Sequence, residues 1–252
     1  MTIVVSVEAE LREKVMLSCR MIGSRGVSKG SFGHVSARIP ESDRILIKSK
    51  GPDEEALEFA TERDIITVDL QGRVLSAPEG LTAPAETAMH LAIYRARPDV
   101  MSVIHSHPLY VMLLTACEKP LIGMYGAYDG DHALRLLEEG IPTYPGSQTI
   151  TTDEMGADFL KVMGNRQACL LRGHGMTVAG TSVEDATATS LTVHELAHTN
   201  YLAYAIGGPL PVLDMDEHRQ RWAAGNGRRR VGGAVNAAGE PFEWRYGKKL
   251  LR

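Results

Sequence analysis

The chain has 252 residues, of which 44% are hydrophobic and 23% charged, and its net charge at pH 7 is -4. This composition is typical of a globular protein with a sizeable core, and it excludes the broad positive charge that recruits nucleic acid or an anionic membrane. Three scattered cysteines argue against a disulfide scaffold, no apolar run approaches a membrane span, and the N-terminus does not resemble a signal peptide. We therefore expect a cytoplasmic enzyme or binding protein with a small-molecule partner.

Helix and strand patterns alternate through the first half of the chain. Helical spacing of apolar residues predicts helices over 8–25, 85–95 and 110–116. Short apolar runs bounded by turn residues predict strands over 34–39, 44–47, 65–70, 73–75, 100–105 and 120–124. The closely spaced early strands indicate hairpins rather than parallel crossovers.

The second half continues this pattern. Helices are expected over 132–139, 152–163 and 183–206, and strands over 168–172 and 176–179 on either side of a Gly-His-Gly turn. Hairpins mixed with helices predict an α/β fold with a mixed, largely antiparallel central sheet. We expect one domain over residues 1–252. Its polar, Gly-rich end from about 207 to 252, with Arg228, Arg229 and Arg230, is expected to form a covering arm at a subunit contact.

Three histidines follow apolar strands. His105 and His107 are two residues apart, so both side chains face the same way in an extended chain, and His174 lies in a turn between two glycines. Three imidazoles at two strand ends are typical of an open catalytic metal site. The alternative is that these histidines are ordinary hydrogen-bonded side chains.

A second histidine pattern competes with the first. His194, Glu195 and His198 form an H-E-x-x-H sequence on the predicted helix 183–206, which is the zinc-protease pattern. No H-x-x-G-x-x-H extension follows, and the downstream Glu217 lies beyond a Gly-Gly-Pro break. We therefore expect no catalytic ion on this helix.

Four motifs in order resemble the class II aldolase/adducin-like family. They are G-H-V-S-A-R at 33–38, P-A-E-T-A-M-H at 84–90, H-S-H at 105–107 and R-G-H-G at 172–175, and the resemblance covers residues 8 to 206. It implies a three-layer α/β/α fold with one divalent ion, zinc or manganese, with iron or cobalt as further candidates. The implied ligands are His105, His107 and His174, and Glu86 is implied as the acid/base and a potential fourth ligand.

The departures from the family's aldolases point to a different substrate. Sugar-phosphate aldolases of this family carry asparagine where His34 stands and two serines where Pro84 and Ala85 stand, and they use those side chains to hold phosphate. The combination F-G-H-x-S-A-R with R-G-H-G resembles the family's non-oxidative decarboxylases of hydroxylated aromatic or pyridine dicarboxylic acids. That resemblance implies a metal-dependent carboxy-lyase in which burial raises the pKa of Glu86 so that it delivers a proton.

The substrate's second carboxylate needs a cation. Arg172 is the first candidate because a guanidinium forks onto a carboxylate, and Arg38 and Lys48 are the others. His34 is expected to be a catalytic residue beside Glu86, able to hydrogen-bond an acid or phenol group of the substrate. Arg172 in a structural salt bridge is the alternative. An aldolase or dehydratase acting on a small hydroxy-carbonyl or sugar-phosphate compound is the alternative function, and an adducin-like binding module is a third. The resemblance also implies a homotetramer.

Overall fold

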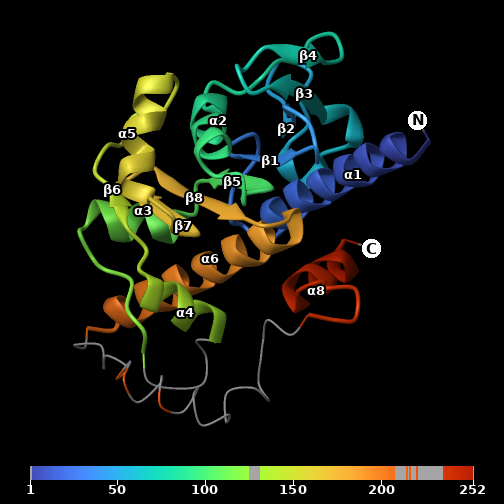
Figure 1. The fold of residues 1–252 in the computed structure, drawn as a ribbon. Helices are drawn as coiled ribbons and strands as arrows, with labels where there is room; N and C mark the ends of the chain where they lie inside the picture. Colours follow the sequence, from blue (N-terminus) through green and yellow to red (C-terminus); the bar gives the residue numbers. More distant parts are fainter. Residues whose placement is uncertain are drawn as a thin grey trace.

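An eight-stranded sheet divides the molecule into two helical layers (Figure 1). The structure is a computed structural model, and it describes residues 2–124, 131–207, 214, 216, 220 and 235–251. The strands are β1 (His34–Arg38), β2 (Arg44–Lys48), β3 (Ile65–Asp69), β4 (Val74–Ser76), β5 (Ser102–Ser106), β6 (Thr143–Tyr144), β7 (Ala168–Leu171) and β8 (Gly175–Gly180). Their order is β4-β3-β2-β1-β5-β8-β7-β6, and all pairs are antiparallel except β6 with β7. The predicted mixed, largely antiparallel sheet is confirmed.

Helices cover both faces of this sheet. They are α1 (Thr2–Ser24), α2 (Thr87–Ala96), α3 (Leu109–Ala116), α4 (Asp131–Glu139), α5 (Asp153–Met163), α6 (Val183–Ala205) and α8 (Phe242–Leu250). Helices α1 and α6 pack together on one face, and α2 and α5 pack together on the other (Figure 1). Two short 3-10 turns, Leu57–Phe59 and Glu62–Asp64, lie between β2 and β3. The three-layer α/β/α arrangement implied by the resemblance is confirmed.

Side chains alternate along the strands, so each face of the sheet has its own hydrophobic core. Leu46 and Ile104 join the core under α1 and α6, whereas their neighbours Ile45, Ile47 and Val103 join the core under α2 and α5. Successive side chains of a strand point to opposite sides, so a strand buried on both faces is apolar throughout. The polar exceptions on the α2 face of the central strands, described below, therefore stand out.

The segment 120–124 does not form a strand of the sheet, contrary to the prediction. The side-chain amide of Asn200, on α6, takes both backbone groups of Ile122: Oδ1 accepts from the Ile122 N–H at 3.0 Å and Nδ2 donates to its carbonyl at 3.1 Å. The backbone groups of Ile122 are thus satisfied by a helix side chain and not by a neighbouring strand.

Helix α8 was also missed, since the sequence predicted only a polar arm after residue 207. Trp244 of α8 is buried against α1 and α6, and Gly247 lets the helix approach Met21 closely. Arg228, Arg229 and Arg230 lie outside the described residues, so their expected subunit contact stays a prediction. Among the described residues, the structure contains no helix with the length and apolar character needed to cross a membrane.

Candidate metal centre

Three central strands place polar side chains in one row across the sheet. His34 on β1 is paired with His105 on β5, and His105 is paired with Thr177 on β8. Val103 faces the α2 side, so His105, two residues on, faces the same side. The row therefore lies under α2, and Glu86 is the residue at which α2 begins.

Four side chains converge above this row. One ligand atom from each of Glu86, His105, His107 and His174 lies within 4.8 Å of all the others. The Nε2 atoms of His105 and His107 are 2.9 Å apart, Glu86 Oε2 is 3.2 Å from His105 Nε2, and Glu86 Oε1 is 3.6 Å from His174 Nε2. The structure thus brings together the four residues expected to surround a metal ion.

The glycines around His174 make this convergence sterically feasible. Gly173 has a φ of +64°, a conformation that side chains disfavour, and its N–H donates to Thr115 Oγ1 at 3.0 Å. A Cβ on Gly175 would lie 2.2 Å from the carbonyl oxygen of Ser106, so only glycine lets β8 start this close to β5. The turn consequently delivers His174 to the end of β5, beside His107.

The hydrogen bonds of Thr177 fix the orientation of the His105 ring. Thr177 Oγ1 lies 3.1 Å from His105 Nδ1 and donates to the sulfur of Met89 at 3.2 Å. Because its only hydroxyl hydrogen is directed at Met89, the oxygen accepts from Nδ1–H of His105. This leaves the lone pair on Nε2, the atom that faces the cluster, as metal ligation requires.

Burial keeps His107 and His174 neutral. Desolvation, with the neighbouring imidazoles adding to it, lowers the pKa of His107 to about 3 and also lowers the pKa of His174. Metal-ligating histidines must be deprotonated, so a chain that holds them neutral removes the competition from protons.

The pKa of Glu86 is shifted in the direction opposite to the one expected. Burial alone would raise it, but interactions with the neighbouring His105 and His34 side chains favour the ionised form and lower the pKa of Glu86 below its usual range. The prediction that burial raises the pKa of Glu86 is therefore wrong, and its role as the proton donor stays a prediction. In the resting chain its carboxyl group is an anionic acceptor.

The donor set fits a divalent cation. Glu86 Oε1 is a buried carboxylate oxygen that has no hydrogen-bond partner among the described residues, and an unpaired buried oxygen beside three imidazoles is costly without a cation. Three imidazoles with one carboxylate suit zinc, manganese, iron or cobalt. His105, His107, His174 and Glu86 are therefore the residues that would hold the ion.

His34 lies beside this cluster and is not one of its four members. Its Nε2 is 3.7 Å from Glu86 Oε2, and its Nδ1 is 3.0 Å from Nε2 of His90. Burial lowers the pKa of His34 to about 4, although the Glu86 carboxylate opposes the shift. His34 is thus a neutral imidazole with one ring nitrogen directed at the carboxylate of Glu86.

Two of the three proposed carboxylate-binding cations have internal partners. Lys48 lies on the face opposite to Ile47, toward α1, where it is 2% exposed and pairs with Glu54 at 3.4 Å and Asp64 at 3.8 Å. Arg38 donates to the carbonyl of Tyr94, near the far end of α2. Eight helical residues separate Tyr94 from Glu86, which corresponds to about 12 Å.

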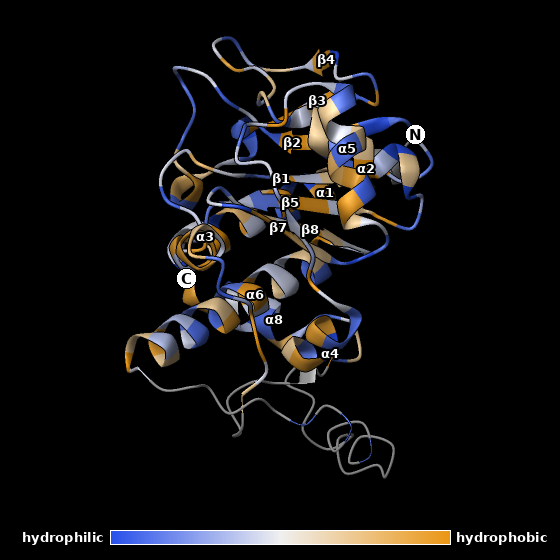
Figure 2. Cartoon of the chain, turned by 90° about the vertical axis from the view of Figure 1, so that its left-hand side faces the viewer, coloured by the Kyte–Doolittle hydropathy of each residue, from blue (hydrophilic) through white to orange (hydrophobic). Residues whose placement is uncertain are grey.

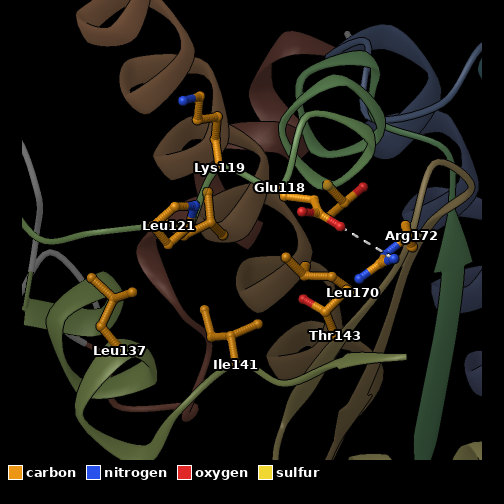
Figure 3. Close-up of a pocket in the computed structure, with 10 residues that line it drawn as sticks. Glu118, Lys119, Leu121, Leu137, Ile141, Thr143, Leu170 and Arg172 are labelled. Carbon is orange, nitrogen blue, oxygen red and sulfur yellow. Dashed lines mark ion pairs between the residues drawn. The ribbon is translucent and has the colours of Figure 1, made fainter. Parts of the chain in front are cut away.

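Arg172 is not part of the metal cluster; it lines another cavity, of about 500 Å³ (Figure 3). Its guanidinium pairs with Glu118 at 3.3 Å, and Figure 3 shows the two side chains directed at each other. Both are exposed, so the pair is weak and replaceable by a ligand. The apolar lining comes from Leu121, Leu137, Ile141 and Leu170, and none of the four cluster residues lines this cavity.

Two residues near the cluster were missed by the sequence analysis. Lys50 is partly exposed, its backbone pairs with Thr82 just before α2, and its charge acts on both His34 and Glu86. Phe32 is 65% exposed, with its ring 5.8 Å from that of His107. A single lysine and a loop phenylalanine carry no motif, so only their folded positions reveal them.

The H-E-x-x-H residues of α6 lie in other contacts. Tyr110 stacks on His198 with ring centroids 4.3 Å apart and also approaches His194, while Glu195 pairs with Arg25 at 3.1 Å. Among the described residues, the only group of three or more potential ligands is the one around Glu86. The expectation that this helix holds no catalytic ion stays a prediction.

The chain resembles known proteins over most of its length. Residues 13–201 match the family described as Class II Aldolase and Adducin N-terminal domain. The chain is 36% identical to a 3,4-dihydroxyphthalate decarboxylase of Arthrobacter keyseri over 83% of this chain and 86% of that protein. It is 29% identical to an L-fuculose phosphate aldolase of Escherichia coli, over 82% and 90% respectively.

Solved structures share the fold. An aldolase II superfamily protein of Pseudomonas syringae superposes with a TM-score of 0.79 at 21% identity, covering 97% of this chain and 93% of that one. Decarboxylases and aldolases are both lyases. With this fold, this match and a histidine–glutamate cluster at the ends of its central strands, the chain is a lyase that belongs to the class II aldolase and adducin family.

Proposed function

We propose that the chain is a divalent-metal-dependent, non-oxidative decarboxylase of a hydroxylated aromatic or pyridine dicarboxylic acid. The observation that carries the proposal is the position of His34, a neutral imidazole directed at Glu86 where the family's sugar-phosphate aldolases have asparagine. The higher identity to a dihydroxyphthalate decarboxylase than to a fuculose phosphate aldolase supports it.

The anionic state of Glu86 sets the order of proton transfers. Its carboxylate accepts the proton of the ring hydroxyl that lies ortho to the departing carboxylate. Glu86 then passes the same proton to the ring carbon that bears the departing carboxylate, which gives a keto tautomer with a tetrahedral carbon. The carbon–carbon bond breaks, carbon dioxide leaves, and the electron pair of that bond restores the aromatic ring, with the negative charge on the former hydroxyl oxygen. Glu86 is again a carboxylate, and the phenolate product takes up a proton from solvent. When bound, a divalent ion supplies a Lewis acid that orients the substrate's oxygens and offsets their negative charge.

The residues around the cluster suit a planar, doubly charged substrate. Phe32 offers an exposed aromatic face beside His107. Lys50 is a half-buried cation near Glu86 whose ion pair within the described residues is with Glu54, at 3.7 Å, and we assign it to the substrate's second carboxylate. Arg172 stays a candidate for this role, because its exposed partner Glu118 is easily displaced. We assign Arg38 and Lys48 to structural roles.

The activity is tested by carbon dioxide release from 3,4-dihydroxyphthalate with zinc- and manganese-loaded protein, set against cleavage of L-fuculose 1-phosphate. We expect release of carbon dioxide from the aromatic acid and loss of about 10²- to 10⁴-fold in kcat for Glu86→Gln, the range of a positioned proton-transfer group. Faster cleavage of the sugar phosphate would refute the decarboxylase and favour the alternative, an aldolase.

Metal binding has its own test. We expect His107→Gln and His174→Gln to lose zinc, measured by competition with a chromophoric chelator. His132 serves as the control, because it is a half-buried histidine that contacts Thr189 and Thr192 away from the cluster. Unchanged zinc affinity in both cluster variants, or equal loss in His132→Gln, would reject the site.

The carboxylate-binding cation is identified by comparing Lys50→Met with Arg172→Met. Removing a charge-assisted contact costs roughly 1.5–3 kcal/mol, or about 10- to 100-fold in kcat/KM. We expect this loss for Lys50→Met and near-normal kinetics for Arg172→Met. The reverse result would return the role to Arg172. Lys161→Met is the control, since Lys161 pairs with Asp158 on the surface of α5.

We also propose a cytoplasmic homotetramer. Helix α3 is apolar on most of its surface (Figure 2), and with α6 it exposes Leu109, Leu113, Leu202 and Ile206. The three cysteines are free thiols, as expected in a reducing compartment. Sedimentation equilibrium of the metal-loaded protein should give four chains, and an active monomer would contradict the proposal.

A further inference from the structure

A continuous series of polar side chains runs from the metal cluster into the core under α2. From His34, which faces Glu86, the next contacts are Nδ1 of His34 to Nε2 of His90 at 3.0 Å and Nδ1 of His90 to Oγ of Ser36 at 2.7 Å. Ser36 Oγ then lies 2.8 Å from Oη of Tyr94. Of these, His90 and Ser36 are fully buried and Tyr94 is 1% exposed, so the side chains themselves must satisfy one another.

The carboxylate at one end favours one of the two hydrogen patterns that the series allows. A neutral imidazole has one donor and one acceptor nitrogen, and an ionised carboxylate only accepts. Nε2 of His34 therefore carries the hydrogen that faces Glu86, and its Nδ1 accepts from Nε2–H of His90. Nδ1 of His90 then accepts the hydroxyl hydrogen of Ser36, whose oxygen accepts from Tyr94. Every group has one consistent role.

The opposite hydrogen pattern is less favourable at the Glu86 end. It would direct the lone pair of His34 Nε2 at the carboxylate of Glu86, which is repulsive. It would also turn the hydroxyl hydrogen of Ser36 away from His90, to Oη of Tyr94 at 2.8 Å or to the carbonyl of Val103 at 3.3 Å.

We propose that His90 and Ser36 are positioning residues that hold His34 in the tautomer with its hydrogen on Nε2. His34 then enters the reaction as a hydrogen-bond donor, and it is neither a general base nor a metal ligand. The group it serves is an oxygen anion, such as the carboxylate or developing phenolate of a substrate. Only this last assignment rests on the proposed function, because the tautomer belongs to the resting chain.

The tautomer is read directly by ¹⁵N NMR of zinc-loaded protein with labelled histidine, because protonated and unprotonated nitrogens of a neutral ring have well-separated shifts. The His34 signals are assigned with His34→Gln. We expect a protonated Nε2 and an unprotonated Nδ1 in the wild type. Ser36→Ala should mix or reverse the tautomers of His34, and Ser36→Thr, which retains the hydroxyl, should restore them.

The control variant is Ser18→Ala, which removes another buried hydroxyl, hydrogen-bonded to Thr187 at 2.7 Å between α1 and α6. We expect no change in the His34 signals. A wild-type His34 protonated on Nδ1 would overturn the proposal even if Ser36→Ala fails to fold, and so would an unchanged His34 spectrum in Ser36→Ala. Absence of decarboxylase activity would leave the tautomer result standing, so the two proposals fail separately.

Discussion

Replacing Thr177 with valine should weaken metal binding without touching any of the four ligands. Thr177 is fully buried, and its hydroxyl oxygen accepts from Nδ1–H of His105 while its hydrogen is directed at Met89. Valine has nearly the same shape and lacks the acceptor. In Thr177→Val the Nδ1–H of His105 is left without an acceptor. Alternatively, the ring changes tautomer and carries its hydrogen on Nε2, the atom that faces the cluster.

Both outcomes weaken binding by a similar amount. An unpaired buried N–H costs about 1–3 kcal/mol, and 1.4 kcal/mol is a factor of ten, so the ring's preference for the ligating tautomer falls by about 5- to 150-fold. Loss of a partner that orients a ligating histidine typically lowers metal affinity by about 10- to 100-fold. We therefore expect the zinc Kd of Thr177→Val to rise by about 10- to 100-fold.

The assay is zinc competition with a chromophoric chelator, together with urea unfolding of the metal-free protein. Thr187→Val is the matched control, because Thr187 is a fully buried threonine on α6 that contacts Ser18. We expect this control to lose stability and keep its zinc Kd. A zinc Kd in Thr177→Val within twofold of the wild type would refute the argument that Thr177 sets the His105 tautomer.

Three further predictions concern titration, thiols and the close approach of two strands. Burial holds the pKa of His34 at about 4, below the value of about 6.5 in an unfolded chain, so its contribution to stability is complete above pH 6.5 and is lost as the pH falls toward 4. The urea midpoint of metal-free protein should fall over this window, and equal pH slopes in His34→Gln would contradict the assignment. Burial raises the pKa of Cys19 and Cys169 to about 12, so one thiol per native chain, that of exposed Cys117, should react with a disulfide reagent at pH 8; rapid labelling of all three would show that the cores open readily. Gly175→Ala places a Cβ 2.2 Å from a backbone oxygen of β5, so β8 must move away from β5. We expect the variant to lose about 1–3 kcal/mol of unfolding free energy and most of its metal affinity. A normal zinc Kd would show that the turn tolerates this movement.

The sequence predicted most elements of this fold, because the apolar patterns that define them are local. The strands at 34–38 and 102–106 and the helix at 183–205 agree with prediction to within a few residues. The two-residue strand Thr143–Tyr144 is too short to show alternation and was missed. Helix α8 was missed because its apolar residues are few, and Trp244 is buried only once α1 and α6 are in place.

The candidate site was likewise predicted only in part. The expected ligands His105, His107 and His174 and their partner Glu86 do converge, because a pattern at strand ends translates directly into position. The surrounding electrostatics could not be predicted, since the pKa of Glu86 depends on which imidazoles face it. The carboxylate-binding cation was equally hard to predict. Lys48 was proposed from its charge, but its partners Glu54 and Asp64 lie on the other face of the strand. Lys50, which lies near Glu86, was not identified from the sequence.

Because His34, His105 and Thr177 lie in one row across three strands, the geometry of the metal cluster depends on the alignment of those strands. One inserted residue within β5 would reverse the facing of every later side chain in that strand and send His105 into the core under α1 and α6. A sheet with this register shift would still pack against apolar side chains on both faces, since both faces are lined by aliphatic residues. A slipped but compact molecule would therefore be hard to distinguish by its secondary structure, and its failure to take up zinc would expose it.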